Sequence, residues 1–199
     1  MSTLAKSYLT PEQYLEIERK AEYKSEYYQG EMFAMPGARR AHNLIAVNTV
    51  ASLHRQLRGR PCEAYSTDMR VCVTPNGLYT YPDIVIVCGE PQFVDDTFDT
   101  LLNPTVIIEV LSESTEAYDR GRKFDLYQSL ESLSEYLLID SQRVSAGLFT
   151  RQPNGQWLLT NRTQLEDSID LQSVGCRLLL ADVYEKIDFS PPAPPPVTP

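Results

Sequence analysis

The chain has 199 residues, of which 42% are hydrophobic and 23% charged, and its formal net charge at pH 7 is -9. This length fits one domain with a core of its own, so we expect a single domain over residues 1–189. The negative charge argues against a general nucleic-acid binder, because contacts to phosphates need cations. The start of the sequence is charged, and no apolar run approaches the roughly 20 residues of a membrane span. We therefore expect a cytoplasmic protein with no membrane partner.

The charges are distributed unevenly along the chain. Between Met32 and Cys62 there is no acid, whereas five acids and no base lie between Asp83 and Asp99. The acid-free segment contains Arg39, Arg40, His42, His54, Arg55, Arg58 and Arg60. Two explanations stay open for it, a solvated helix face that balances charge and a surface that faces phosphates.

The four cysteines do not form a CxxC pair, and three of them lie in or beside apolar runs typical of strands. Free cysteine packs in such places as a small hydrophobic residue. We therefore predict neither a structural zinc site nor a disulfide framework.

The first part of the chain predicts a helix, a hairpin and a longer helix. Thr10-Pro11-Glu12 is typical of a helix start, and this helix would end near Ala21. Residues 26–28 and 32–35 flank Gln29-Gly30 and predict a hairpin. Apolar residues then recur at steps of 4, 3 and 4, which predicts a helix over residues 40–57 with one buried stripe.

The rest of the chain alternates between strands and helices. Strands are expected at 62–66 and 69–74, and the Pro75-Asn76-Gly77 turn would lead into a strand over 81–87. After a polar loop over 89–102 we expect a strand around Glu109, a helix from 112–115 to Leu130, and a strand over 135–139. A hairpin over 146–150 and 157–160 and a short helix over 178–187 would follow. Residues 190–199 are rich in proline and predict a disordered tail.

Glu109 lies in the apolar run NPTVIIEVLS, and Asp83 comes 26 residues earlier at the mouth of the apolar run IVIV. One explanation is a half-exposed strand that turns Glu109 toward water. The other is a buried carboxylate, which must be neutralised, paired or bound to a metal. If the two strands are neighbours, both carboxylates converge, and a divalent cation between them would relieve their repulsion. Two carboxylates with several waters suit Mg²⁺.

Lys123 follows on the next helix, beside the inward-facing Phe124. Its ammonium group would orient a water or offset the charge of a phosphate near the metal. Alternatively, it is a lysine at a helix start that extends its amine into solvent.

The stretches YPDIVIVCG and PTVIIEVLSESTEAYDRGRKFDLYQSLESLSEYLLID resemble the restriction-endonuclease-like proteins of the Uma-two family, which is abundant in cyanobacteria and part of the PD-(D/E)XK nuclease superfamily. YYQGEMFAMPGARRAHN is similar as well, so the resemblance covers about residues 26–180. It implies an α/β fold, a mixed sheet flanked by helices, with an added N-terminal helix and hairpin. It also implies Mg²⁺-dependent hydrolysis of phosphodiester bonds, with Asp83 and Glu109 as metal ligands.

The chain departs from the superfamily pattern in one place. The motif lysine would fall at position 111, where this chain has Leu111, and Lys123 is the natural replacement. The superfamily often adds a polar residue from its first core helix, a role that His42 or the hairpin residue Glu31 would supply. His42 has an alternative as a buried, hydrogen-bonded helix residue, and Glu31 as a turn acid.

Our first hypothesis is a DNA endonuclease that uses Mg²⁺ or Mn²⁺, in which Arg39, Arg40, Arg55 and Arg58 contact backbone phosphates. By analogy with the family we expect a homodimer, since paired sites often cut both strands. Leu111 and the net charge motivate an alternative, an inactive nuclease fold that binds DNA or another protein. A third possibility is a hydrolase of RNA or of a nucleotide, since the site does not identify the sugar.

Overall fold

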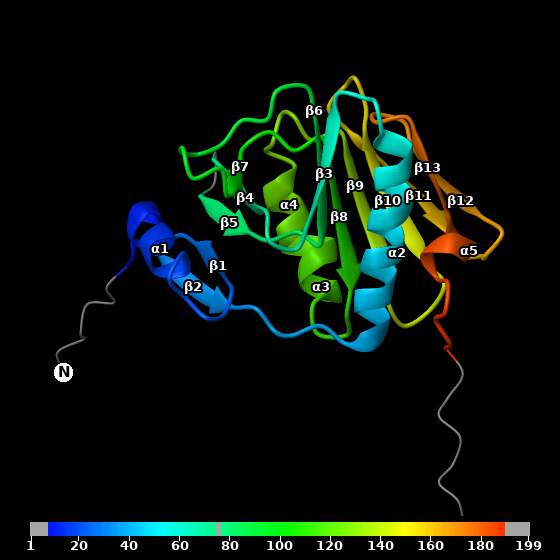
Figure 1. The fold of residues 1–199 in the computed structure, drawn as a ribbon, viewed down its shortest axis with the longest axis horizontal. Coiled ribbons are helices and arrows are strands. Elements are labelled where there is room, and N and C mark those ends of the chain that lie inside the picture. The colour runs from blue at the N-terminus through cyan, green and yellow to red at the C-terminus, as the bar shows by residue number, and fades with distance from the viewer. Residues whose placement is uncertain (1–7, 75–76, 190–199) are drawn as a thin grey trace, which may run out of the picture.

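The chain is built around a central mixed sheet (Figure 1). The structure is a computed structural model that describes residues 8–74 and 77–189. The sheet has six strands in the order β11-β10-β9-β8-β6-β3, and only β8 and β9 pair in parallel. Its strands are β3 (Cys62–Ser66), β6 (Ile84–Cys88), β8 (Val106–Leu111), β9 (Glu135–Asp140), β10 (Ala146–Arg151) and β11 (Trp157–Arg162).

One face of this sheet is covered by α2 (Arg40–Leu57), the predicted helix with its predicted limits. Ile45 and Leu53 of α2 are completely buried against even-numbered strand residues such as Ile84 and Ile108. The hairpin β12 (Ser168–Leu171) and β13 (Cys176–Leu179) and the short α5 (Leu180–Val183) complete this face.

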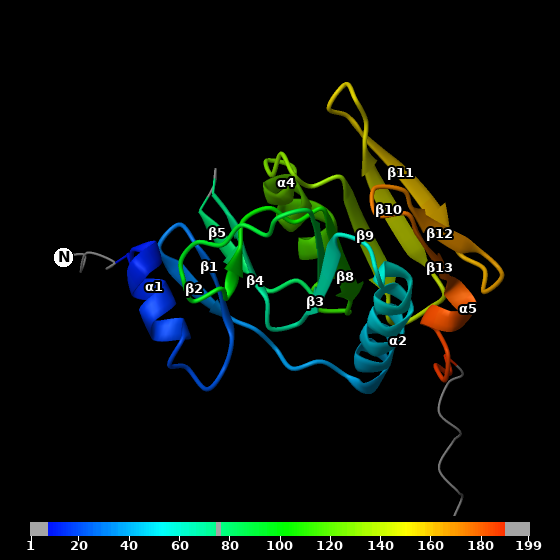
Figure 2. The ribbon, with the colours of Figure 1, turned by 45° about the horizontal axis from the view of Figure 1, so that its top comes forward.

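The opposite face is covered by a continuous helical segment, formed by α3 (Glu116–Tyr118), the π-helical turn η1 (Asp119–Lys123) and α4 (Phe124–Tyr127). Figure 2 shows α4 and α2 on opposite sides of the sheet. Phe124 and Tyr127 pack on odd-numbered strand residues such as Ile107. Because both faces are covered, all six residues of β8 are buried, so the half-exposed strand is excluded.

A second sheet carries the N-terminal part of the chain, in the order β2-β1-β5-β4-β7. It consists of β1 (Ser25–Tyr28), β2 (Glu31–Ala34), β4 (Arg70–Val73), β5 (Leu78–Thr80) and β7 (Thr100–Leu101). The β1–β2 hairpin turns at Gln29 and Gly30, both with positive φ, as the sequence predicts. Helix α1 (Pro11–Glu18) starts with a capping box between Thr10 and Gln13 and packs through Tyr14 on this sheet.

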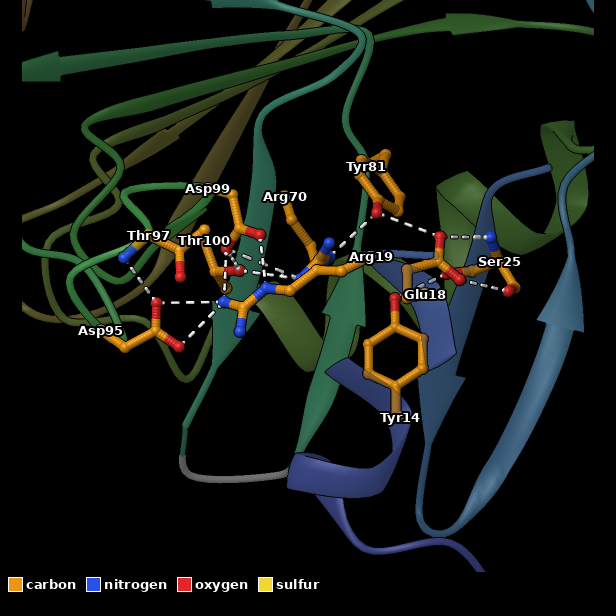
Figure 3. Close-up of polar contacts among 10 residues, drawn as sticks. All are labelled: Tyr14, Glu18, Arg19, Ser25, Arg70, Tyr81, Asp95, Thr97, Asp99 and Thr100. Carbon is orange, nitrogen blue, oxygen red and sulfur yellow. Dashed lines mark hydrogen bonds and ion pairs between the residues drawn. The ribbon is translucent and has the colours of Figure 1, made fainter. Parts of the chain in front are cut away.

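A polar network, buried at Glu18, Arg70 and Tyr81, joins α1 to the second sheet and to the loop before β7 (Figure 3). Arg70 donates from Nε to Tyr81 Oη over 2.9 Å, and Tyr81 donates to Glu18 Oε1 over 3.0 Å. Arg19 binds Asp99 and Asp95, each at 2.8 Å. Tyr81 of this network lies two residues before Asp83. The network therefore holds α1 close to the segment that leads into β6.

Four expectations need correction. The turn around residue 77 joins β4 to β5 and does not lead directly into the strand expected over 81–87, which is β6 and pairs with β3 and β8. That pairing brings Cys62 opposite Cys88, and the two form a disulfide, so the prediction of free cysteines was wrong there. The loop over 89–102 contains β7. Most of the expected closing helix is instead β13, α5 and a turn.

The expected disordered tail over 190–199 lies outside the described residues. Over the parts of the chain that are described, no helix has both the length and the apolar character needed to cross a membrane.

Candidate active site

Asp83 and Glu109 meet where β6 and β8 lie side by side. The two strands are antiparallel, with Ile84 opposite Ile108, so Asp83 at the entrance of β6 comes level with Glu109. The backbone N–H of Asp83 donates to Glu109 Oε2 over 3.3 Å, and the N–H of Val110 donates to Asp83 Oδ2 over 2.8 Å. The predicted convergence of the two carboxylates is confirmed.

Glu109 is 4% exposed and is surrounded by donors. Lys123 Nζ lies 2.9 Å from its Oε1, and Tyr127 Oη donates to the same oxygen over 3.1 Å. Burial raises the pKa of Glu109 to about 8, and the negative charges of Asp119 and Asp83 act in the same direction, against Lys123. Burial therefore favours the protonated form of Glu109, and Lys123 is the main group that opposes this effect.

Lys123 lies at the centre of the acidic cluster. Its Nζ is 3.1 Å from Glu26 Oε1 and 3.5 Å from Asp119 Oδ1, in addition to its contact with Glu109. Burial would lower the pKa of Lys123, but the surrounding carboxylates, Glu109 foremost, raise it well above its usual value. The amine is therefore protonated at neutral pH, and the alternative in which it extends into solvent is excluded, because Lys123 is 4% exposed. π-Helical turns such as η1, which ends at Lys123, are frequent at functional sites.

Leu111 occupies the position of the superfamily lysine. It is 1% exposed and lies in the core with Phe124 and Tyr127. Lys123 brings an ammonium group to Glu109 from the helical segment instead. A lysine is therefore present at the acidic pair despite the departure from the motif.

Two acids of this cluster were missed by the sequence reasoning. Glu26 comes from β1 and accepts hydrogen bonds from Thr80 Oγ1 and, over 3.2 Å, from Tyr118 Oη. Asp119 begins η1 and is 4% exposed, and burial raises its pKa. The sequence feature that could have pointed to Glu26 is its position in the short strand that the Gln29-Gly30 turn predicts.

His42 lies in the first turn of α2, with Nε2 3.2 Å from Asp83 Oδ2. Burial would lower its pKa, but the hydrogen bond and the charge of Asp83 raise it instead. Its Nδ1 is buried without a hydrogen-bond partner among the described residues. His42 therefore holds Asp83 in place and keeps one nitrogen without a protein partner.

These side chains line a cleft of about 1150 Å³ between the β1–β2 hairpin and the end of the central sheet. The cleft brings together Glu26, His42, Asp83, Glu109, Asp119 and Lys123, with Arg39 and Arg122 also in its lining. Four predicted catalytic residues and one predicted phosphate-contacting residue, Arg39, thus share one cleft.

The remaining predicted residues lie elsewhere. Glu31 does not line the cleft but a smaller hollow that adjoins it and shares Tyr28, Phe33 and Arg122 with it. Arg40 is exposed outside the lining, and Arg55 and Arg58 lie at the far end of α2, on the order of 20 Å along its axis. Of the four arginines expected to meet DNA, only Arg39 lines the cleft.

The donor set at Asp83 and Glu109 fits a hard divalent cation. Both candidate ligands are carboxylates, which Mg²⁺ prefers, and among the described residues nothing donates to Asp83 Oδ1. Within residues 8–74 and 77–189, no three His, Cys, Asp or Glu side chains form a complete ligand set. A bound Mg²⁺ would therefore complete its shell with waters or substrate oxygens, as this ion usually does.

A mixed sheet flanked by helices, with acids converging at neighbouring strands, defines a protein of the restriction-endonuclease-like fold. A solved structure from Anabaena variabilis ATCC 29413, described as "a putative nuclease belonging to DUF820", has this fold with a TM-score of 0.72 at 17% identity. The match covers 88% of this chain and 97% of that one.

Residues 11–181 match the family Uma2, described as "Putative restriction endonuclease", and the chain belongs to this family. It is similar to two proteins of Synechocystis sp. (strain ATCC 27184 / PCC 6803 / Kazusa). "Uncharacterized protein slr1290" is 35% identical over 91% of this chain and 94% of its own length. "Uncharacterized protein sll1609" is 36% identical over 76% and 86%, respectively. Membership of the family supports a nuclease-like function.

Proposed function

We propose that this protein is a metal-dependent endonuclease that hydrolyses phosphodiester bonds of DNA. The observation that carries the proposal is the convergence of Asp83 and Glu109 from neighbouring strands beside the protonated Lys123. Asp83 and Glu109 would hold Mg²⁺ or Mn²⁺. Such an ion, when bound, supplies a Lewis acid and lowers the pKa of a coordinated water.

The other cleft residues have roles that follow from their charge and contacts. Lys123 would act as a fixed cation that binds a phosphate oxygen, because its surrounding acids keep it protonated. His42 Nε2 lies 3.2 Å from Asp83 Oδ2, and a hydrogen bond donated from there would orient that carboxylate. Arg39 and Arg122 line the cleft and would contact neighbouring phosphates, which position the substrate without reading its sequence.

The test is a nicking assay on supercoiled plasmid with MgCl₂ or MnCl₂, and with EDTA as the metal-free reference. We expect nicking by the wild type and by Asp96→Asn, which changes an exposed acid of the polar loop outside the cleft. We expect at least a 100-fold loss for Asp83→Asn, within the 10²–10⁴-fold range of a single positioned catalytic group. Equal nicking by wild type and Asp83→Asn would refute the proposal.

The proposal includes a homodimer, because cleavage of both strands of a duplex is simplest with two sites. Light scattering coupled to size-exclusion chromatography tests this part separately. A mass near twice 22.6 kDa is expected, and a mass of one chain would limit the enzyme to nicking.

A further inference from the structure

The β1–β2 hairpin presents an aromatic side chain beside the acidic cluster. Phe33 of β2 lies directly opposite Glu26 of β1, and directly opposed residues project from the same face of a hairpin. Glu26 Oε1 is 3.1 Å from Lys123 Nζ, so this face is turned toward the site. Phe33 therefore belongs to the cleft wall next to the proposed reaction centre.

Phe33 is 50% exposed although it lines this cleft. Tyr23, a second large aromatic in the same lining, is 81% exposed. The neighbouring aromatics Tyr27 and Tyr79 are instead packed in the core under the hairpin. Exposed aromatic groups gathered at a cleft are typical of a binding surface. Single exposed apolar residues scattered over a surface, in contrast, are normal and need no such explanation.

A cation lies against another aromatic ring of the cleft wall. The guanidinium of Arg122 lies over the ring of Tyr28 at 4.9 Å, and the same arginine lines the cleft. Tyr28 is two residues from Glu26 on β1 and so projects from the same face. The cleft wall thus combines exposed aromatic rings with an arginine, and a groove of aromatic and basic side chains binds the bases and phosphates of a single strand.

On this basis we propose that the cleft takes single-stranded nucleic acid and that Phe33 stacks on an unpaired base beside the cleaved phosphate. Within a duplex both faces of a base are covered by its neighbours, so only an unstacked base offers a face to Phe33. The cleft of about 1150 Å³ is close to the size of small-ligand pockets, about 300 to 1000 Å³, and suits a few nucleotides. Only the cleavage of the phosphate next to the stacked base rests on the proposed function; the binding of a single strand does not.

The test measures binding by fluorescence anisotropy. A fluorescein-labelled oligo(dT) of 12 nucleotides and a labelled 12-base-pair duplex are titrated with the full chain, once in EDTA and once with Ca²⁺. We expect tighter binding of the single strand. Phe33→Ala should weaken it about 5- to 150-fold, the effect of losing one base-stacking aromatic.

Matched variants separate stacking from simple apolar contact. Phe33→Trp should retain binding, whereas Phe33→Leu should weaken it, because leucine is apolar but has no ring face. Phe98→Ala removes another exposed phenylalanine, 62% exposed and outside the cleft lining, and should leave binding unchanged. Circular dichroism melting of each variant shows that the fold is kept.

The outcomes distinguish this inference from the proposed function. If single-strand binding depends on Phe33 but neither plasmid nor circular single strand is cut, the stacking site stands and the nuclease proposal fails. If plasmid is nicked in an Asp83-dependent way while Phe33→Ala and Phe33→Leu bind and cut like the wild type, the nuclease stands and the stacking site is overturned. No single-strand binding in either buffer, or equal losses for Phe33→Ala and Phe98→Ala, also overturns it.

Discussion

Lys123 Nζ lies 2.9 Å from Glu109 Oε1, and both side chains are buried. The two residues come from different layers, Lys123 from the helical segment and Glu109 from the central sheet. Each charge would be costly in the interior without the other. The pair therefore couples the stability of the fold to the geometry of the site.

Replacing Lys123 with methionine should lower the free energy of unfolding by about 3 to 5 kcal/mol, because Glu26, Glu109 and Asp119 would lose the cation that they share in the interior. Urea unfolding near pH 8 measures this change. The double variant Lys123→Met with Glu109→Gln should recover part of the loss, since it removes both charges. A matched control is Lys20→Met. Lys20 and its partner Glu16 are both exposed, so the loss of this pair should cost less than about 1 kcal/mol. Equal costs for Lys123→Met and Lys20→Met would contradict this view of the pair.

Mg²⁺ or Mn²⁺ should raise the melting temperature of the wild type, because an ion that binds only the folded state stabilises it by mass action. At a hundred times the dissociation constant the gain is about 2.7 kcal/mol. Asp83→Asn should remove most of the shift, while Glu185→Gln, a change to an exposed acid outside the cleft, should keep it. Thermal scans at several metal concentrations measure the effect. An unchanged shift in Asp83→Asn would remove Asp83 from the metal site.

Much of the fold follows from local patterns. The limits of α2 follow from its apolar spacing, and the placing of Asp83 and Glu109 follows from two apolar strands that carry one acid each. Both signals lie within short segments of the chain, where period and burial determine the structure. The convergence itself needed only the additional assumption that the two strands are neighbours.

What the sequence could not predict depends on contacts between distant segments. Glu26 and Lys123 touch because the N-terminal hairpin packs over the helical segment, and no local pattern encodes that docking. The Cys62–Cys88 disulfide depends on the register of β3 against β6, in which the two cysteines are directly opposite each other. A one-residue slip of β3 would remove this pairing. The strong turn signal at residue 77 indicated a hairpin correctly but not which later strand would pair.

The contact between Arg19 and Asp99 predicts a loss of stability in acid. The hydrogen bond from Arg19 is the main cause that lowers the pKa of Asp99 to about 2, below the value of about 3.9 in an unfolded chain. A lowered folded-state pKa stabilises the protein above the unfolded value, and this stability is lost as the pH falls from about 4 through 2. Arg19→Met should therefore show a smaller loss over that range than the wild type.

Urea unfolding at pH 6 and at pH 3 measures this acid dependence. Arg58→Met, which removes an exposed arginine at the end of α2, serves as the control and should keep the wild-type dependence. If Arg19→Met loses as much stability between the two pH values as the control does, Arg19 does not determine the acid response.

The hydroxyl of Tyr81 connects two buried charges, accepting from Arg70 and donating to Glu18 (Figure 3). Tyr81→Phe leaves both charged groups short of one partner, so it should lower the free energy of unfolding by about 1 to 3 kcal/mol. Tyr23→Phe removes the hydroxyl of an 81% exposed tyrosine and should change it by less than about 0.5 kcal/mol. Urea unfolding compares the two variants. Equal values would mean that the network does not hold α1 against the strand that leads to Asp83.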